Sequence, residues 1–297
     1  IGVGNESVAI AERSYQQALT YAKDRIQGTT HDGGKRVSII HHPDVRRMLL
    51  TMKSQIEAMR AIVYMTAVEL DLSRRSVSES DRKLHRKRAD LLTPVVKGWC
   101  SEISQELTSI GLQIHGGMGY IEETGAAQHF RDARITTIYE GTTGIQANDL
   151  VGRKILKDKG LALQTLLQDI ELTISELDTG HSILARIEHE LSESIESVRA
   201  SLIYLMNHYR DDQHLAGAVS YNFLMMLGTL TAGWQAARSA QIAVQQIQSG
   251  ASDGEFYESK LVSCQFFAEQ ILPKVHAYGK SIRTGSAAMM ALSEDQF

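Results

Sequence analysis

The chain has 297 residues, of which 43% are hydrophobic, 22% are charged and only three are proline. Its proline share of about 1% lies well below the usual share of about 5%, which argues against a β-sandwich or barrel with many turns and predicts long uninterrupted helices. The net charge of −4 gives the protein no electrostatic bias toward nucleic acid. Two cysteines, Cys100 and Cys264, exclude a disulfide scaffold and fit a reducing compartment.

The chain opens at Ile1, without a methionine or a leader-like segment, and we interpret it as a piece of a longer protein. It contains no run of 18 or more apolar residues, so no membrane span is predicted. The 11 histidines show no metal-ligand spacing, and no metal site is predicted.

The apolar pattern of the first half predicts four long helices that pack as a four-helix bundle. They are expected over residues 5–27, from Pro43 to about residue 70, over residues 80–114 and from Thr142 to about residue 156, with a loop through residues 28–34 after the first. The second helix is the clearest, because its apolar residues recur at alternating spacings of four and three. They are Val45, Leu49, Met52, Ile56, Met59, Val63, Thr66 and Leu70. Pro94 should kink the third helix or mark its true start.

The second half also has a helical pattern and begins at a boundary near Lys157–Gly160. Its helices are expected over residues 161–178, 182–210, 213–249 and 254–291. The predicted fold class is therefore all-α, with a four-helix domain at residues 1–157 and an appended helical domain at residues 158–297.

Glycines are concentrated in one part of the chain. Eight of the 23 lie between Gly111 and Gly152. Residues 113–120, with Gly116 and Gly117, could bring the backbone close to a ligand phosphate. The alternative is an ordinary helix C-cap and turn.

Glu140 is the candidate catalytic residue. It lies between the apolar residues Ile135, Ile138 and Tyr139 and a Gly-Thr pair that is typical of a helix start. Apolar neighbours would raise its pKa by desolvation, as a general base near neutrality requires. The alternative is a glutamate that caps the following helix.

Three linked motifs in this region resemble the C-terminal half of the acyl-CoA dehydrogenase family. They are Gln113–Tyr120 (QIHGGMGY), Arg131–Ile135 (RDARI) and Ile138–Thr142 (IYEGT), in the family's order and spacing. Ala9–Ala18 followed by Arg25 resembles the first helix of the family's C-terminal domain. Residues 157–297 are similar to an extra helical domain of a bacterial subgroup, which includes enzymes that act on methylthiopropanoyl-CoA.

The resemblance implies α,β-dehydrogenation of an acyl-CoA thioester with FAD as cofactor. Glu140 would remove the α-proton while the β-hydrogen leaves as hydride to the flavin. The Glu140 backbone N–H and a flavin ribityl hydroxyl would hold the thioester carbonyl. Gly141 would let the acyl chain and the flavin approach the backbone, and Tyr139 would line the acyl pocket.

The resemblance also assigns cofactor contacts. Arg25 would approach the flavin pyrophosphate, Thr142 would touch the same cofactor, and Gln113, Gly116 and Gly117 would hold the adenosine part of FAD from the neighbouring subunit. Such a shared site implies a homodimer or a tetramer. The sequence departs from the family at residues 26–28, at Pro43 and at Gly144, each of which removes a possible side-chain contact to FAD.

The whole enzyme would pass electrons to an electron-transfer flavoprotein, in the bacterial cytoplasm or in the mitochondrial matrix of a eukaryote. One alternative is an acyl-CoA oxidase-like flavoenzyme that O2 re-oxidises. Another is a structural helical module that mediates assembly and is inactive by itself. We expect the isolated 297 residues to be inactive and not to retain FAD.

A basic run at the start of the third helix could suggest nucleic acid, but no aromatic residues interleave with it. It consists of Arg82, Lys83, His85, Arg86, Lys87 and Arg88. A solvated helix face is the preferred interpretation.

Overall fold

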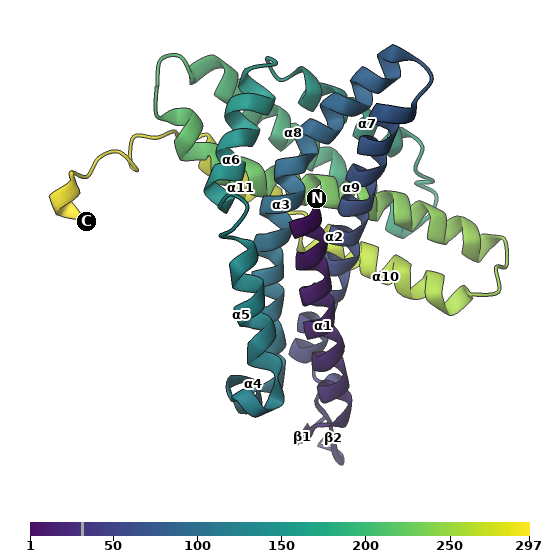
Figure 1. Ribbon diagram of the computed structural model, residues 1–297. Coiled ribbons are helices and arrows are strands. Elements are labelled where there is room, and N and C mark those ends of the chain that lie inside the picture. Colours follow the sequence, from purple (N-terminus) through teal and green to yellow (C-terminus); the bar gives the residue numbers. More distant parts are fainter. Residues whose placement is uncertain (31–32) are drawn as a thin grey trace.

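The computed structural model describes residues 1–30 and 33–297, and it confirms the all-α prediction (Figure 1). Helices of the first half are α1 (Gly2–Asp24), α2 (Pro43–Arg75), α3 (Glu79–His115), α4 (Gly117–Tyr120), α5 (Ala126–Thr136) and α6 (Thr143–Asn148), which continues as a π-helical segment (Asp149–Leu156). Helices of the second half are α7 (Leu161–Ser175), α8 (Ser182–His208), α9 (Leu215–Gln248), α10 (Gly254–Gln270) and α11 (Lys274–Ile282).

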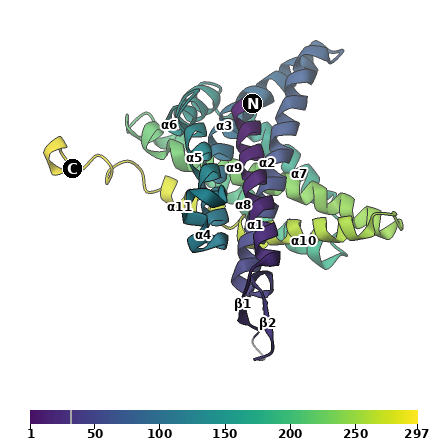
Figure 2. The ribbon, with the colours of Figure 1, turned by 60° about the horizontal axis from the view of Figure 1, so that its bottom comes forward.

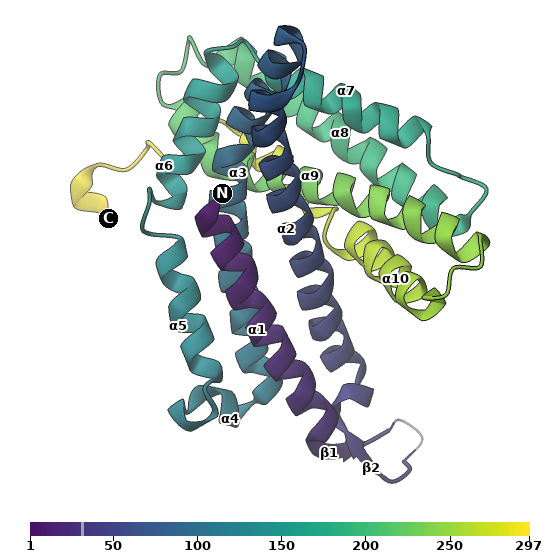
Figure 3. The same ribbon diagram turned by 45° about the vertical axis from the view of Figure 1, so that its right-hand side comes forward.

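Helices α1, α2, α3 and α5 run side by side, and α7 to α10 lie crosswise against this bundle (Figure 3). Small residues let α1 and α3 approach closely. A Cβ atom on Gly111 would lie 2.2 Å from the Ser14 hydroxyl oxygen, and one on Gly4 would lie 2.8 Å from the Val96 carbonyl oxygen. These glycines therefore fix how closely the two helices pack.

Helix α2 buries the predicted seam, from Leu49 through Met52 and Met59 to Thr66. Burial extends beyond that seam, because Ser54 and Ala58 on a neighbouring face are also buried. This wider burial arises because α9 and α10 pack on α2 from the side away from the bundle.

Several expected boundaries were wrong. The first helix ends at Asp24 and is followed by an antiparallel hairpin of β1 (Ile26–Thr29) and β2 (Arg36–Ser38). Gly33 and Gly34 of the predicted loop lie between these strands, and His31 and Asp32 lie outside the described residues. Helix α5, which contains the second motif, was not expected. The last helix, expected over 254–291, breaks before Pro273, which has no N–H to continue the ladder, and α11 ends at Ile282. Pro94, by contrast, lies inside α3 and does not mark its start.

In the part of the chain that the structure describes, one helix, α9, is long and apolar enough by length and composition to cross a membrane. However, 72% of its most apolar window is buried inside the protein. We interpret α9 as the core helix of the second half.

The two halves share one continuous hydrophobic core. A close contact between the halves joins α3 to α9, where a Cβ atom on Gly228 would lie 2.2 Å from the Trp99 indole ring. The Trp99 ring is fully buried, and its Nε1–H donates to the Thr229 hydroxyl at 3.2 Å. The division into domains at residues 157 and 158 stays a prediction, since the core does not end there.

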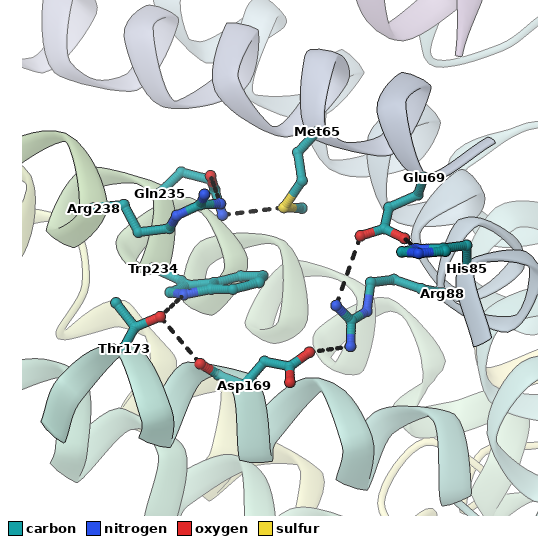
Figure 4. A network of polar contacts seen from close by, with 9 residues as sticks. All are labelled: Met65, Glu69, His85, Arg88, Asp169, Thr173, Trp234, Gln235 and Arg238. Atoms are coloured by element: carbon teal, nitrogen blue, oxygen red, sulfur yellow. Dashed lines mark hydrogen bonds and ion pairs between the residues drawn. The ribbon is translucent and has the colours of Figure 1, made fainter. Parts of the chain in front are cut away.

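A polar network also crosses between the halves (Figure 4). The Arg88 guanidinium of α3 contacts Glu69 of α2 at 3.6 Å and also forms an ion pair with Asp169 of α7. His85 Nδ1 lies 2.7 Å from a Glu69 oxygen. The solvated-face interpretation therefore suits the exposed Lys83 of the basic run but was wrong for Arg88, whose side chain is only 13% exposed.

Gly228→Ala should lower the free energy of unfolding of this chain by about 2 kcal/mol, because the new methyl group overlaps the Trp99 ring and the two helices must separate. Urea unfolding followed by circular dichroism measures the change. Gly217→Ala on the same helix is the matched control, since its Cβ meets no atom within 4 Å, and it should stabilise by about 0.5–1 kcal/mol. Equal effects of the two substitutions would contradict the packing argument.

Candidate functional site

The turn between α5 and α6 has an unusual backbone. Glu140 has φ of +54° and Gly141 has φ of +85°, so two successive residues are left-handed. A non-glycine residue in this region is uncommon, costs free energy, and is found most often at functional sites. The next residue, Thr142, caps α6 through a hydrogen bond from the Ile145 N–H to its hydroxyl at 3.3 Å. The interpretation of Glu140 as the helix cap was therefore wrong.

Side chains from α3 and α6 hold this turn in place. The Gln146 amide donates to the Glu140 carbonyl at 3.1 Å. The buried Thr143 hydroxyl donates to a Glu102 oxygen of α3 at 2.6 Å. The sequence motifs did not point to these contacts, because they join residues whose proximity depends on how α6 packs on α3.

The Glu140 side chain is exposed, contrary to the expected burial among apolar neighbours. Ile135, Ile138 and Ile145 around it are each about half exposed as well. The turn and its flanking helices therefore expose apolar side chains close in sequence to this carboxylate. The expected desolvation of Glu140 is not supplied by the residues that the structure describes.

Tyr139, the residue before Glu140, forms a side-chain hydrogen bond to another helix. Its hydroxyl donates to the Glu6 carboxylate of α1, and this hydrogen bond raises the pKa of Tyr139 to about 12. The contact ties the turn to the first turns of α1. The role of Tyr139 in an acyl pocket stays a prediction.

The other predicted residues gather at the C-terminal end of α3. Gly116, with φ of +59°, ends the helix, so the C-cap interpretation is correct. A cavity of about 400 Å³ opens at the same place, lined in part by Arg25, Gly116 and Gly117. Gln113 is exposed nearby but does not line this cavity.

The lining of this cavity suits a phosphate-bearing group. A Cβ atom on Gly116 or Gly117 would meet nothing within 4 Å, so the backbone faces open space. Within the described chain, the exposed Arg25 guanidinium makes no ion pair and is available to an anion. The residues present therefore fit part of a site for a dinucleotide such as FAD. In the same described ranges, no three His, Cys, Asp or Glu side chains gather as metal ligands would.

The predicted residues thus form two separate groups. Tyr139, Glu140, Gly141 and Thr142 lie beside Glu102 of α3, whereas the Gly116 cavity lies at the end of that helix, near α4 and the hairpin (Figures 1 and 2). At 1.5 Å per residue, the 13 residues from Glu102 to His115 separate the groups by about 20 Å.

The described residues form an all-α bundle that carries an exposed carboxylate on a left-handed turn. The family model for the acyl-CoA dehydrogenase C-terminal domain matches residues 1–155, and that for the acetyl-CoA dehydrogenase C-terminal like domain matches residues 166–293. The chain therefore belongs to the acyl-CoA dehydrogenase family.

Individual relatives agree with this assignment. The chain is 44% identical to 3-methylmercaptopropionyl-CoA dehydrogenase of Ruegeria pomeroyi over 97% of its own length and 49% of that protein. It spans about half the length of the curated relatives that it matches first.

Solved structures show the same fold. The match with Caenorhabditis elegans ACDH-11 in complex with C11-CoA covers 91% of this chain and 42% of the ACDH-11 chain. The TM-score is 0.76 and the sequence identity is 19%. The match with a Bacillus anthracis acyl-CoA dehydrogenase complexed with FAD covers 94% of this chain and 47% of the Bacillus chain, with a TM-score of 0.72 and 21% identity.

Gly141→Ala should lower the free energy of unfolding by about 1–2 kcal/mol, because the left-handed conformation is costly for alanine. Its Cβ would also lie 2.9 Å from the Gln146 amide nitrogen. Gly144→Ala, three residues further along, is the control, since Gly144 has no positive φ and its Cβ would make only an ordinary contact with Thr142 at 3.9 Å. Thermal unfolding should separate the two variants, and an unchanged Gly141→Ala melting temperature would rule out a rigid turn.

Proposed function

We propose that this chain is the C-terminal half of an FAD-dependent acyl-CoA dehydrogenase in which Glu140 is the catalytic base. The observation that carries the proposal is the left-handed turn that bears Glu140, an exposed carboxylate in a segment with exposed apolar side chains. Membership of the family and the IYEGT motif support the same role.

The chemistry requires a base and an oxyanion donor close together, because the α-proton of a thioester is only weakly acidic. The Glu140 carboxylate takes the α-proton. The Glu140 backbone N–H has no acceptor in the described part of the chain, so it is free to donate to the thioester carbonyl as negative charge develops there. FAD, when bound, accepts the β-hydrogen as hydride. Gly141 leaves room at the backbone for the acyl chain, and Tyr139 lines its pocket.

Cofactor binding would use both groups of residues. Thr142 contacts the FAD of its own active site beside Glu140. Gln113, Gly116 and Gly117, about 20 Å away along α3, would hold the adenosine part of the FAD in the neighbouring subunit's site. Arg25, which lines the same cavity as Gly116 and Gly117, would approach a flavin pyrophosphate. Two residue groups so far apart favour a homodimer or a tetramer with shared sites.

The proposed substrate is an acyl-CoA, and the proposed electron acceptor is an electron-transfer flavoprotein. Relatives named as acyl-CoA dehydrogenases and the C11-CoA bound to ACDH-11 support the substrate class. The proposed location is the bacterial cytoplasm, which the two free, buried cysteines and the bacterial relatives favour.

In the full-length protein, Glu140→Gln should leave FAD bound and abolish the bleaching of the flavin by acyl-CoA, because the amide cannot accept the α-proton. Absorbance at the flavin band measures both cofactor content and bleaching. Glu123→Gln is the control and should bleach normally, because it removes an exposed carboxylate from the short turn that precedes the N-terminus of α5. Bleaching at a wild-type rate in Glu140→Gln would sink the assignment of the base.

The isolated chain of residues 1–297 should purify colourless and inactive, because Glu140 is uncovered and the two residue groups supply only parts of two different FAD sites. Adding FAD and measuring binding by fluorescence quenching checks this. A stoichiometric yellow complex would show that these residues suffice to hold the cofactor.

A further inference from the structure

Lys97 is a buried lysine without a partner. The residue lies on α3 and is only 4% exposed, and its Nζ atom is shielded from solvent and has no hydrogen-bond partner in the described chain. Burial lowers the pKa of Lys97, while the nearby Glu102 and Glu140 carboxylates act in the opposite direction. An ammonium group in such a place is costly to the fold, because neither water nor a counter-ion contacts it directly.

The surroundings of Lys97 place it behind the Glu140 turn. The backbone of its neighbour Val96 contacts α1 at Gly4. On the other side, a Cβ atom on Gly98 would lie 3.5 Å from the Gln146 side chain, which holds the Glu140 carbonyl. Lys97 therefore lies where α1, α3 and α6 meet.

The two carboxylates that act on Lys97 both belong to the proposed active site. Glu102 anchors the turn by accepting from Thr143, and Glu140 is the proposed base. Lys97 forms no ion pair within 4 Å with either of them among the described residues. Its charge therefore acts on the two carboxylates over a distance longer than that of a direct ion pair.

We propose that Lys97 is a positioning residue of the dehydrogenation site, whose buried charge keeps the Glu140 carboxylate ionised when substrate and the rest of the enzyme cover it. The inference rests on the proposed function. Covering Glu140 with apolar groups favours its neutral acid, which cannot take a proton. A fixed positive charge behind the turn opposes that effect without contacting the substrate.

Other charged groups face the turn as well. Glu6 of α1 reaches it through the Tyr139 hydroxyl, and Arg134 of α5 donates to the Thr137 hydroxyl at 3.1 Å. Tyr221 of α9 faces Glu102. Helix α6 carries no charged side chain. Of the two cations in this set, Arg134 is exposed and Lys97 is buried.

The test compares Lys97→Met, Lys97→Arg and Lys83→Met in the full-length enzyme. Lys83→Met is the matched control, because it removes an exposed lysine from the far end of the same helix. The measurement is kcat/KM against pH by flavin bleaching. Loss of the Lys97 charge should move the acid limb of the profile about one pH unit higher. At a pH below that limb the rate should fall about tenfold, and at high pH it should approach wild type. Lys97→Arg and Lys83→Met should keep the wild-type limb.

A structural role gives a different result. Lys97→Met should leave the melting temperature of the chain unchanged or raise it, because methionine fills a similar volume without a buried charge. A lower melting temperature with an equal loss of kcat/KM at every pH would overturn the proposal, and so would an unshifted acid limb in a fully active Lys97→Met enzyme. A wild-type enzyme that acyl-CoA does not bleach would instead contradict the proposed function, and the Lys97 inference would fall with it.

Discussion

The packing of α3 against α9 is the contact on which the rest of the structure depends. Trp99 lies directly over Gly228, where no side chain larger than hydrogen fits. The opposite side of α3 packs on α1 and α2, so this one helix belongs to the core of both halves. Because the same helix carries Glu102, which accepts from Thr143, the packing of Trp99 on Gly228 also affects where the Glu140 turn lies.

The turn itself is held against its own backbone preference. A left-handed glutamate is less stable than a right-handed one, and among the described residues no hydrogen bond to the Glu140 carboxylate compensates for this. The compensation comes from neighbouring contacts, namely the Gln146 amide on the Glu140 carbonyl and Glu102 on Thr143. As a result, both the carboxylate and the backbone N–H of Glu140 remain unused by the fold, which is what a base and an oxyanion donor require.

Much of the fold could be predicted from periodicity, because long helices repeat their apolar residues many times. The α2 seam from Val45 to Leu70 is the clearest case. Short elements gave no such signal: the strands at residues 26–29 and 36–38 bury little, and α5 spans only 11 residues between two glycine-containing turns. At the site, motifs located Glu140 and the Gly116 turn. They could not show that Glu140 is exposed, nor that Gln146 holds its carbonyl and Glu102 accepts from Thr143, because those facts depend on packing between segments.

The exposure of Glu140 and the isolation of Lys97 have a common explanation under the proposed function. A carboxylate exposed to water stays ionised without a nearby cation. In the isolated chain, the buried and unpaired charge of Lys97 would therefore only lower the stability of the fold. Once an acyl chain and the rest of the enzyme exclude water from that surface, the balance changes, because the carboxylate loses its hydration and the charge of Lys97 then acts in a medium of low dielectric constant. Under the proposed function, the buried charge of Lys97 therefore contributes to the site only when this surface is covered.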